Sequence, residues 1–401
     1  MNTHTDFDVL IIGAGPAGST AAALLAEHGH RVLVLEREKF PRYHIGESLT
    51  GMAADVLNDF GLSHEMDRRL FPPKGGVKVI GKDAGSEFFV PVLQPTWQVR
   101  RDEFDQILLN NAIQRGATYR QGTVSGVLRE SSTVTGVVYT PAGDDQPREV
   151  RCRVVADASG QAALLARFGV AGPVLRTEFD KQVAVFSQFR GARRDPGEMG
   201  DNTFLFYSDT HNWAWFIPLS PDVVSVGIVQ PVEKMQQCGR PEAAFEWGVK
   251  HLNPDLGWRV EGCERVEPVR AATNYSYVVD PFVGDGWLAV GDAHQFNDPI
   301  FSFGVSFAMV EGREASRAIL KSFETFDSTA PFAEYRDFCV RGQMAALDVI
   351  RYFWKFPVFF GYQSRGEARK DIIRLLGSDC HSFTEPRALA VMRRALRKLA
   401  A

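Results

Sequence analysis

The chain has 401 residues, which is long for one compact domain and predicts two domains or one nucleotide-binding domain enlarged by insertions. Hydrophobic residues make up 45% of the chain, so it can bury a large core. Its formal net charge of -4 gives no overall attraction to nucleic acid or to an anionic membrane.

The cysteines and the apolar runs indicate whether to expect disulfides, a metal site or a membrane span. The 5 cysteines are odd in number, scattered and without a CxxC pair, which argues against a disulfide framework and against a zinc site. No run approaches the roughly 20 apolar residues of a membrane span. We therefore expect reduced thiols, no metal, no nucleic-acid partner, no stable membrane insertion and a cytoplasmic location.

The first forty residues predict a dinucleotide-binding unit. An apolar run, Val9 to Ile12, is followed by the motif Gly13-x-Gly15-x-x-Gly18, an alanine-rich helix pattern and a second apolar run that ends at Glu36. In such a unit the first glycine permits the tight turn, the second lets the backbone approach a pyrophosphate, and the third lets helix and sheet pack closely. The N-terminus of the helix then offers free N–H groups to the phosphates.

Glu36 indicates which dinucleotide the unit takes. A carboxylate at the end of the second strand accepts hydrogen bonds from the ribose hydroxyls of the adenosine. An acid at this place disfavours a ribose phosphate, so FAD or NAD fits better than NADP.

Alternating apolar residues predict a second set of strands outside this unit. Between the last of these strands and the next cofactor segment, Pro241 to Pro254 has the pattern of a helix. The predicted strands lie in residues 75–92, 181–191, 202–208, 212–219 and 223–231.

Three further stretches distinguish FAD from NAD: residues 97–112, 154–160 and 286–316 resemble FAD enzymes of the group that contains the aromatic hydroxylases. The resemblance implies that Asp292 bonds the ribityl chain, that Arg101 lies near the phosphates and ribityl, and that the helix after Gly304 points at the isoalloxazine. A helix dipole there stabilises negative charge on reduced flavin. Taken alone, Asp292 could be an ordinary turn residue and Arg101 a surface ion-pair partner.

From about residue 330 the pattern is helical, with an aromatic cluster, Tyr352 to Tyr362, that Pro357 interrupts. This region is either a cap over the substrate mouth or a tail packed on the main body. The last helix pattern, residues 386–400, is basic and amphipathic, which suits a membrane surface, an acidic carrier domain or simply a solvated face.

The predicted fold class is α/β: a GxGxxG FAD-binding domain with a parallel sheet, a mainly antiparallel sheet that covers the substrate, and a helical C-terminal region. The expected domains are a discontinuous FAD-binding domain (1–70, 97–175 and 270–325), a substrate-side sheet (71–96 and 176–269) and a helical cap (326–401).

Four motifs together narrow the chemistry. They are "PRYHIGESL" at residues 41–49, "FPPKGG" with Lys74, Trp213-x-Trp215-x-Ile-Pro, and "DPIFSFGV" at residues 298–305. The combination resembles the flavin-dependent halogenases, especially those that act on phenols, pyrroles and similar electron-rich rings. The resemblance covers nearly the whole chain up to about residue 325 and the tail more loosely.

The resemblance implies a mechanism. FAD, reduced by a separate flavin reductase, reacts with oxygen and with chloride or bromide to form hypohalous acid. This oxidant passes through a tunnel to a lysine that directs it to the aromatic substrate, free or tethered to a carrier protein. Lys74 matches that lysine, although by spacing alone it is a solvated loop lysine, and Lys78 is the alternative candidate. The halide would bind backbone N–H groups around Phe303 and Gly304.

The candidate site residues follow from the motifs and the resemblance together. Lys74, Trp213 and Trp215 are the catalytic candidates, and Phe303 and Gly304 are the halide-binding candidates. The cofactor-binding candidates are Gly13, Gly15, Ala17, Gly18, Glu36, Arg37, Ser48, Arg101, Asp292, Gly304 and Val305.

Two residues depart from the family pattern. Phe303 is larger than is typical beside the glycine and could crowd the halide, and Asn212 stands where a glycine usually precedes the first tryptophan. No match is found for the glutamate base of tryptophan halogenases, which makes free tryptophan an unsuitable substrate.

The two tryptophans share one face of a strand, because residues two apart point to the same side. Core packing alone would explain the pair. In the family context that face lies between flavin and substrate, so the rings would keep organic substrate away from the flavin.

Other functions remain open at this stage. The same scaffold supports an aromatic monooxygenase that transfers oxygen from the flavin directly to the ring, or a flavin reductase of isoprenoid double bonds. A third alternative is a flavin-binding homologue that has lost catalysis.

Overall fold

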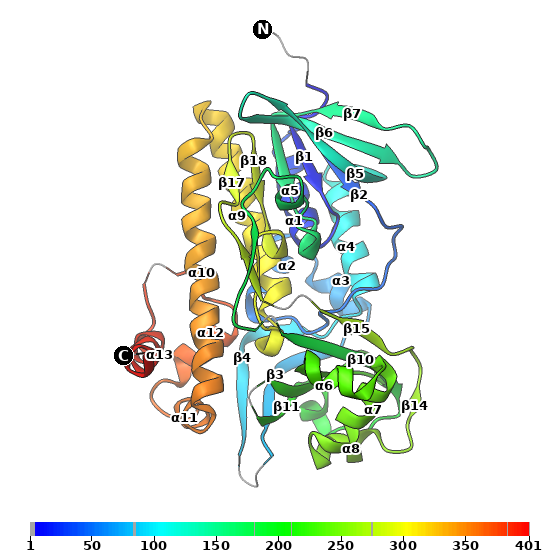
Figure 1. Ribbon diagram of the computed structural model, residues 1–401, viewed down its shortest axis with the longest axis vertical. Helices are drawn as coiled ribbons and strands as arrows, with labels where there is room; N and C mark the ends of the chain where they lie inside the picture. Colours follow the sequence, from blue (N-terminus) through cyan, green and yellow to red (C-terminus); the bar gives the residue numbers. More distant parts are fainter. Residues whose placement is uncertain are drawn as a thin grey trace.

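The computed structural model describes residues 5–82, 86–179, 181–209, 211–273, 276–382 and 384–400. In Figure 1 one sheet lies in the upper half of the molecule and a second sheet in the lower half, while the long helix α10 runs along one side. The expected strand segment at 75–92 contains residues 83–85, which lie outside the described residues, as does Thr210 before the tryptophan strand.

The first sheet has eight strands in the order β17-β18-β8-β1-β2-β5-β6-β7. Its centre is parallel, with Val9 of β1 paired to Val32 of β2 on one side and to Val154 of β8 on the other. These central strands are buried along their whole length, as expected of parallel strands covered on both faces. The strands are β1 Val9–Ile12, β2 Val32–Glu36, β5 Thr118–Glu130, β6 Thr133–Pro141, β7 Arg148–Arg151, β8 Val154–Asp157, β17 Val283–Gly284 and β18 Trp287–Ala289.

The second sheet has the order β14-β10-β13-β12-β11-β3-β4, with β15 paired to β10. It is antiparallel except where β11 runs parallel to β3, so the mainly antiparallel pairing is confirmed. The one segment expected at 75–92 holds parts of two strands, β3 and β4, which pair with each other. Its strands are β3 Pro73–Ile80, β4 Glu87–Trp97, β10 Gln182–Arg190, β11 Thr203–Asp209, β12 Asn212–Pro218, β13 Val223–Pro231, β14 Glu264–Arg265 and β15 Arg270–Ala272.

Strand β15 differs from the sequence expectation. Residues 270–272 were assigned to the cofactor domain, yet Ala271 pairs with Val185 in the second sheet. A strand of three residues carries too little periodicity to reveal its partner. A third, small sheet joins the two halves through β9 Val174–Arg176, β16 Tyr277–Val279 and β19 Gln295–Phe296.

The helices of the N-terminal and middle parts surround the two sheets. Helix α1 begins at Pro16, directly after the glycine turn, and packs against α4 and α9. The helix expected over 241–254 is α7, which ends at His251, and α8 begins at Pro254. These helices are α1 Pro16–Glu27, α2 Gly51–Asp59, α3 Ser63–Arg68, α4 Arg101–Gln114, α5 Leu164–Arg167, α6 Val232–Cys238, α7 Pro241–His251, α8 Pro254–Val260 and α9 Phe303–Thr325.

The tail is helical, as predicted, with α10 Thr329–Lys355, α11 Pro357–Gln363, α12 Arg369–Leu376 and α13 Arg387–Ala400. Its buried side chains, including Phe353 and Phe360, form one core with the tryptophan face of β12 and the start of α9. The tail is therefore packed on the main body. Among the described helices, none has an apolar stretch long enough to cross a bilayer.

Strand β12 shows how the second sheet separates two cores. Trp213, Trp215 and Ile217 face the core shared with α9 and α10, whereas Ala214 and Phe216 face a core shared with α7 and α8. Successive side chains on a strand point to opposite faces, so "NWAWFIP" is buried on both sides. The strand that carries the tryptophan pair is therefore packed against a hydrophobic core on its opposite face as well.

Candidate active site

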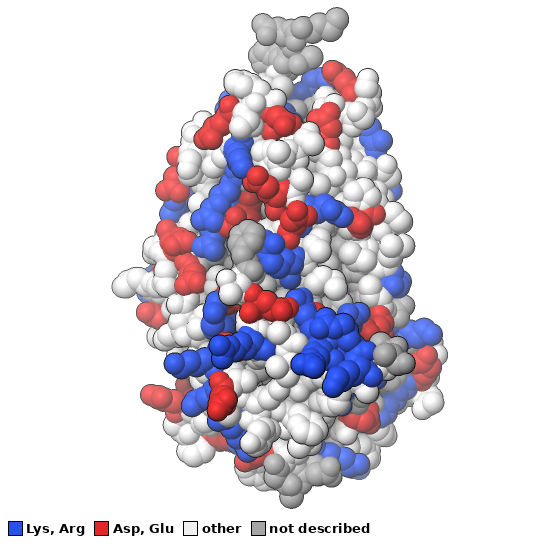
Figure 2. Space-filling view, turned by 90° about the vertical axis from the view of Figure 1, so that its left-hand side faces the viewer, with Lys and Arg blue, Asp and Glu red and all other residues white. Residues whose placement is uncertain are grey.

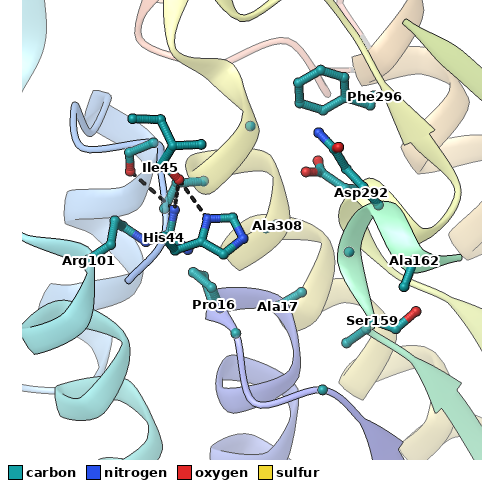
Figure 3. Close-up of a pocket in the computed structure, with 18 of the residues that line it drawn as sticks. Pro16, Ala17, His44, Ile45, Arg101, Ser159, Ala162, Asp292, Phe296 and Ala308 are labelled. Atoms are coloured by element: carbon teal, nitrogen blue, oxygen red, sulfur yellow. Dashed lines mark hydrogen bonds between the residues drawn. The ribbon is translucent and has the colours of Figure 1, made fainter. Parts of the chain in front are cut away.

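One continuous cavity runs from the glycine turn of the first sheet to the tryptophan face of the second. Figure 3 shows Asp292 and His44 on opposite sides of it, with Pro16 and Ala17 at the start of α1 between them. Most of the candidates from the sequence line this cavity: Gly13, Gly15, Ala17, Glu36, Arg37, Ser48, Arg101, Trp213, Trp215, Asp292, Gly304 and Val305. Gly18, Lys74 and Phe303 lie just outside the lining.

The glycine turn has the geometry that its motif predicts. Gly13 has a φ of 104°, which a residue with a side chain rarely adopts. A Cβ at Gly18 would lie 2.0 Å from the carbonyl oxygen of Gly13, so only glycine lets α1 pack this closely on the turn. Gly15 is the N-cap of α1, and the first N–H groups of that helix face the cavity.

Glu36 is buried at the end of β2, and its carboxylate bonds main-chain groups on both sides. Its Oε2 accepts the N–H of Ala14 at 2.9 Å and its Oε1 accepts the N–H of Glu38 at 2.9 Å. Glu36 therefore ties the glycine turn to the end of β2 while it still lines the cavity. Arg37 is exposed at the cavity edge and pairs with Glu38 at 3.2 Å.

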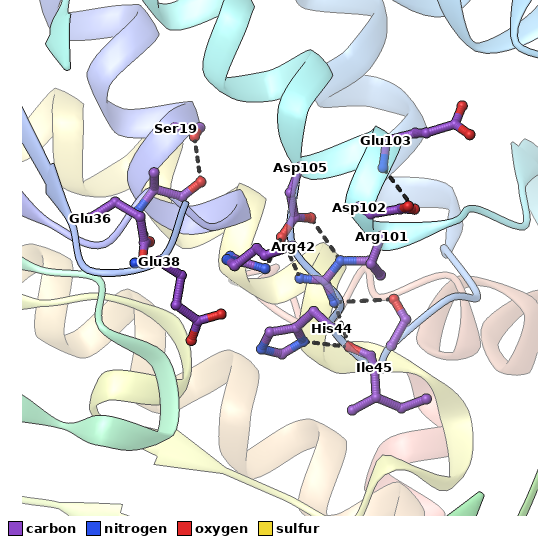
Figure 4. Close-up of polar contacts among 12 residues, drawn as sticks. Ser19, Glu36, Glu38, Arg42, His44, Ile45, Arg101, Asp102, Glu103 and Asp105 are labelled. Carbon is purple, nitrogen blue, oxygen red and sulfur yellow. Dashed lines mark hydrogen bonds and ion pairs between the residues drawn. The ribbon is translucent and has the colours of Figure 1, made fainter. Parts of the chain in front are cut away.

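Arg101 lines the cavity, and it is a buried ion-pair partner, not a surface one. It is buried at the start of α4, and its guanidinium forms two hydrogen bonds to Asp105, of 2.7 and 3.0 Å (Figure 4). It also donates to the carbonyl oxygen of Ile45 at 2.6 Å. Arg42 reaches the same Asp105 carboxylate at 3.0 Å. Arg101 thus holds the cavity loop around Ile45 in place.

These charges set the ionisation of their neighbours. Burial opposes the ionisation of Asp105, but the charge and hydrogen bonds of Arg101, together with the charge of Arg42, lower the pKa of Asp105 overall. Desolvation at the cavity wall, followed by the charge of Arg101, lowers the pKa of His44. The side chain is nevertheless exposed to the cavity, and its Nδ1 lies 2.7 Å from the carbonyl oxygen of Ile45.

Asp292 lies in the turn Gly291–Ala293 and points into the cavity. Burial, and then the charge of Glu311, raise its pKa to about 7. Glu311 holds this turn from α9, because its Oε2 accepts the N–H of Gly291 at 2.9 Å and contacts His294 Nε2 at 2.8 Å. Gln343 of α10 donates to its Oε1 at 2.9 Å.

Glu311 was missed by the sequence interpretation. The available signal was an acid seven residues after Gly304, on the buried face of the α9 helix pattern. A possible ligand atom of Cys339 lies within 4.8 Å of those of His294 and Glu311. The Glu311 carboxylate is already engaged by three protein donors, so its arrangement is explained by hydrogen bonding within the fold.

The N-terminus of α9 opens into the cavity at Gly304. A Cβ at this position would have no other atom within 4 Å, which leaves the first-turn N–H groups accessible. The Phe303 side chain is buried elsewhere: its ring stacks on Phe307 at 5.5 Å and lies 6.0 Å from Phe301. The expected crowding by Phe303 is therefore not seen, because its ring belongs to the core and not to the cavity lining.

Lys74 is 1% exposed, so the alternative of a solvated loop lysine is wrong. It lies in β3 opposite Thr96, and its Nζ donates to Ser48 Oγ at 2.8 Å and to the Leu49 carbonyl oxygen at 2.7 Å. Burial lowers the pKa of Lys74 to about 7, so the neutral amine is well populated near neutral pH.

The Lys74 amine does not line the cavity itself but contacts Ser48, which does. Ser48 and Thr203 both line the cavity, and their hydroxyls are 2.7 Å apart. Lys78, the alternative lysine, is different: its Nζ pairs with Asp195 at 3.1 Å and with Glu87 at 3.7 Å. The Lys78 amine is thus held by two carboxylates, whereas the Lys74 amine is held by a hydroxyl and a carbonyl oxygen.

Both tryptophans are buried, and their ring centroids are 6.0 Å apart. The pair therefore packs in the core and lines the cavity at once. Trp215 Nε1 donates to Ser225 Oγ at 3.1 Å. Among the described residues, Trp213 Nε1 has no hydrogen-bond partner.

Glu47 is a second cavity residue that the sequence did not single out. It lies beside Ser48 in the "PRYHIGESL" segment and is 2% exposed. Burial raises its pKa to about 7, although hydrogen bonds from Ser225 and Gln188 oppose this. The Trp215 indole, Ser225 and Glu47 thus form one connected polar group on the cavity wall.

Comparison with known proteins identifies the class to which this arrangement belongs. Residues 6–324 match the family model of an FAD binding domain, so FAD is the cofactor that the glycine turn and the cavity accommodate. The accessible helix N-termini and the open space at Gly304 fit such a group. The chain is a member of the flavin-dependent halogenases, on the evidence of the following relatives.

Over 398 residues, 99% of this chain and 98% of the relative, the chain is 44% identical to a 1H-pyrrole-2-carbonyl-[peptidyl-carrier protein] brominase of Pseudoalteromonas luteoviolacea. It is 30% identical to the corresponding chlorinase of Pseudomonas fluorescens over 98% of this chain and 93% of the relative. Its fold matches the structure of flavin-dependent brominase Bmp2 with a TM-score of 0.95 and 44% identity, covering 98% and 99% of the two chains. The expected family, fold class and cofactor are thereby confirmed.

Proposed function

We propose that this enzyme brominates a pyrrole ring that is tethered through a thioester to a carrier protein, with reduced FAD supplied by a separate flavin reductase. The full-length similarity to a brominase of a carrier-bound pyrrole supports this substrate over a free phenol or indole. Bromide is favoured over chloride because the chlorinase is the more distant relative, at 30% identity. The observation that carries the proposal is the buried amine of Lys74, which Ser48 holds beside the cofactor cavity.

The cofactor would be held mainly by main-chain groups. The N–H groups at the start of α1, after Gly15, suit the pyrophosphate, and the Glu36 carboxylate suits the ribose hydroxyls. The Asp292 side chain, which points into the cavity from the turn held by Glu311, suits the ribityl hydroxyls. Arg37, Ser48 and Val305 complete the walls.

When bound, reduced FAD supplies two electrons, so that FADH2, O2, Br⁻ and H⁺ yield FAD, HOBr and H2O. The bromide would lie at the first-turn N–H groups of Phe303 and Gly304, where the positive end of the α9 dipole favours an anion. Because this site is made of main chain, the large Phe303 side chain does not alter it.

Lys74 would receive the oxidant and present it to the ring. A neutral amine that donates two hydrogen bonds, as Lys74 does to Ser48 and Leu49, keeps its lone pair free. That lone pair can bind HOBr through its bromine or accept its proton, and the ring then gains bromine and releases a proton. Ser48 fixes the direction of the amine.

Trp213 and Trp215 would keep the pyrrole away from the flavin. Both rings line the cavity, and β12 is buried on its other face against α7 and α8, so the wall has little freedom to move aside. A barrier of this kind lets a small oxidant pass and prevents direct oxygen transfer to the ring, which would make the enzyme a hydroxylase.

The decisive experiment offers the enzyme reduced FAD, oxygen and a pyrrolyl-loaded carrier, with and without bromide. We expect a product whose mass shows the bromine isotope pair and which requires bromide. A hydroxylated product that ignores halide would contradict the proposal and indicate a monooxygenase. Adding only NADH and FAD, without a reductase, should yield no product, because the sequence has no second GxGxxG motif for a nicotinamide cofactor.

A further inference from the structure

The outer face and the inner face of the tail carry different groups. On the face seen in Figure 2, Lys and Arg side chains gather at the level of α13. On the inner face, the turn after α12 contacts the main body: the N–H of Met52, in α2, donates to the Gly377 carbonyl oxygen at 3.0 Å. Gly377 also packs on β4, because a Cβ on it would lie 2.9 Å from the Cβ of Leu93. This turn therefore lies against the strand that pairs with β3, the strand of Lys74.

Three buried hydroxyls meet where this turn contacts the main body. Thr50 precedes α2, Ser306 lies near the start of α9 and Ser378 follows α12, and none of them is more than 1% exposed. Thr50 Oγ1 donates to Ser306 Oγ at 2.6 Å and is 2.6 Å from Ser378 Oγ. Because a hydroxyl has one proton, Ser378 must donate to Thr50. These three residues, here called the hydroxyl trio, thus join α2, α9 and the tail.

The chain forgoes local stabilisation to form the hydroxyl trio. Thr50 is the N-cap of α2, yet its side chain makes no capping bond to that helix, although a threonine there ordinarily satisfies one of the first N–H groups. Ser378 has a φ of 70°, a left-handed conformation that residues with a Cβ rarely adopt. The contact among the three hydroxyls, and not local backbone preference, therefore determines where these residues lie.

The hydroxyl trio holds the segment that receives the Lys74 amine. Ser48 Oγ and the Leu49 carbonyl oxygen, which accept hydrogen bonds from Lys74 Nζ, directly precede Thr50 in the chain. The Thr96 hydroxyl, opposite Lys74 in the sheet, donates to the Thr50 carbonyl oxygen at 3.4 Å. A displacement of Thr50 would therefore move both acceptors of the amine.

The same segment lies against the start of α9 at a second point. A Cβ on Gly46 would lie 3.4 Å from Val305 Cγ2, so the backbone there passes close to the residue that precedes Ser306. The N–H of Thr50 also donates to Ser306 Oγ, at 3.2 Å. These contacts fix the segment to the helix start at which we place the bromide.

We propose, resting on the function proposed above, that Thr50, Ser306 and Ser378 are positioning residues for Lys74. They hold the two acceptors of its amine at a fixed distance from the start of α9, so that the oxidant formed there meets the amine in one orientation. Through Ser378, the turn after α12 takes part in this positioning. A misplacement of about 1 Å can lower a rate by roughly 100-fold, so residues that touch no reacting atom can still control transfer.

The first experiment measures where the bromine goes. The enzyme receives reduced FAD, oxygen, bromide and the pyrrolyl-loaded carrier, together with a soluble β-diketone that traps free HOBr. Thr50→Val removes the hydroxyl at nearly constant volume, and we expect it to oxidise reduced flavin normally but to brominate the ring about 10- to 100-fold more slowly. The trapped bromine should rise correspondingly. Ser306→Ala should act in the same direction, and Thr50→Ser should restore the normal distribution.

The matched control is Ser316→Ala. Ser316 lies on the same helix and is 1% exposed, but its hydroxyl donates within α9, to the Arg313 carbonyl oxygen at 2.7 Å. This variant should distribute bromine as the unchanged enzyme does. An equal shift of bromine to the trap in Ser316→Ala and Thr50→Val would overturn the proposal, and so would an unchanged distribution in both Thr50→Val and Ser306→Ala.

A second measurement needs no turnover. In protein with isotope-labelled lysine, the Lys74 signal is assigned by its loss in Lys74→Met, and NMR follows its pKa. A loosened segment admits water to the amine, so we expect the Lys74 pKa to rise toward its ordinary value in Thr50→Val and Ser378→Ala but not in Ser316→Ala. An unchanged Lys74 pKa in both of the first two variants would overturn the positioning role. If the unchanged enzyme yields neither brominated ring nor trapped bromine, the proposed function fails, while this measurement still decides the positioning of the amine.

Discussion

The part of the cavity that takes the cofactor and the surroundings of Lys74 present different kinds of chemical group. At the cofactor end the groups that face the cavity are main-chain N–H groups of α1 and α9, presented by glycines and helix starts. At the lysine end the environment of Lys74 consists of side chains and carbonyls from distant segments, among them Ser48, Thr96 and Thr203. The first end is open, and the second is closed around one amine.

This difference predicts how strongly side-chain substitutions should affect each of the two sites. A main-chain site survives the substitution of its side chains, as the displaced ring of Phe303 illustrates. A site in which one buried amine is held by two acceptors depends on that single side chain and on its burial. Variants of Lys74 should therefore have larger effects than variants at the cofactor end, and the following predictions test that order.

The largest effect is expected for Lys74→Ala. Loss of the amine should lower the bromination rate by roughly 100- to 10,000-fold, as is typical when one reacting group is removed. FAD affinity and oxidation of reduced flavin by oxygen should remain, which flavin absorbance can follow. The matched control is Lys78→Ala on the same strand, because Lys78 is paired to Asp195. Equal losses in both variants would contradict the role of Lys74.

A smaller but distinct effect is expected for Gly304→Val. A Cβ at this position meets no protein atom within 4 Å, so we expect the thermal midpoint to change little. The side chain would instead occupy the space before the α9 N-terminus, and we expect the KM for bromide and the Kd for FAD to rise about tenfold. Gly304→Ala should give an intermediate effect. A large loss of stability with unchanged KM would show that the position serves only the fold.

The buried amine should also be visible in the pH dependence of stability. The folded pKa of about 7 lies below the ordinary value near 10.4, so the unfolded chain holds a proton that the folded chain releases. Relative to Lys74→Met, the unchanged protein should gain stability as pH rises from about 7 to 10, by roughly 1 kcal/mol per unit. Denaturant titrations at several pH values measure this slope, and a flat difference would place the pKa elsewhere.

The smallest expected effect is a difference in unfolding free energy between variants of the two tryptophans. Trp215→Phe loses the hydrogen bond to Ser225, whereas Trp213→Phe loses none among the described residues. We expect Trp215→Phe to be less stable than Trp213→Phe by about 1 kcal/mol. Both should still brominate without hydroxylating, because a phenyl ring keeps most of the wall. Equal unfolding free energies would mean that the Ser225 bond contributes nothing.

The sequence predicted the cofactor end well because its determinants are local. The tight turn at Gly13 and the acid at Glu36 lie within one strand, helix and strand, so spacing alone was informative. The place of Arg101 near the phosphates and ribityl stays a prediction, and the spacing did not single out Asp105, one helical turn away on the same face, as its ion-pair partner.

The lysine end could not be derived in the same way. Nothing in the spacing of "FPPKGG" shows that Lys74 is buried, because its burial depends on pairing with Thr96 and on contacts with Ser48 and Leu49. Only the family resemblance singled it out. Glu311 was missed for a related reason: an acid in an amphipathic helix is usually solvated, and its task appears only when the Gly291 turn folds back onto it.

The main-chain character of the α9 start has a consequence for evolution and for engineering. No single substitution can delete an N–H group other than a change to proline, so natural variation cannot easily abolish an anion site of this kind. With the halide bound at the α9 start, as we propose, selection between a heavier and a lighter halogen would act on the cavity residues around Gly304, such as Val305. Libraries that aim to change the halogen should vary those neighbours and leave the helix start untouched.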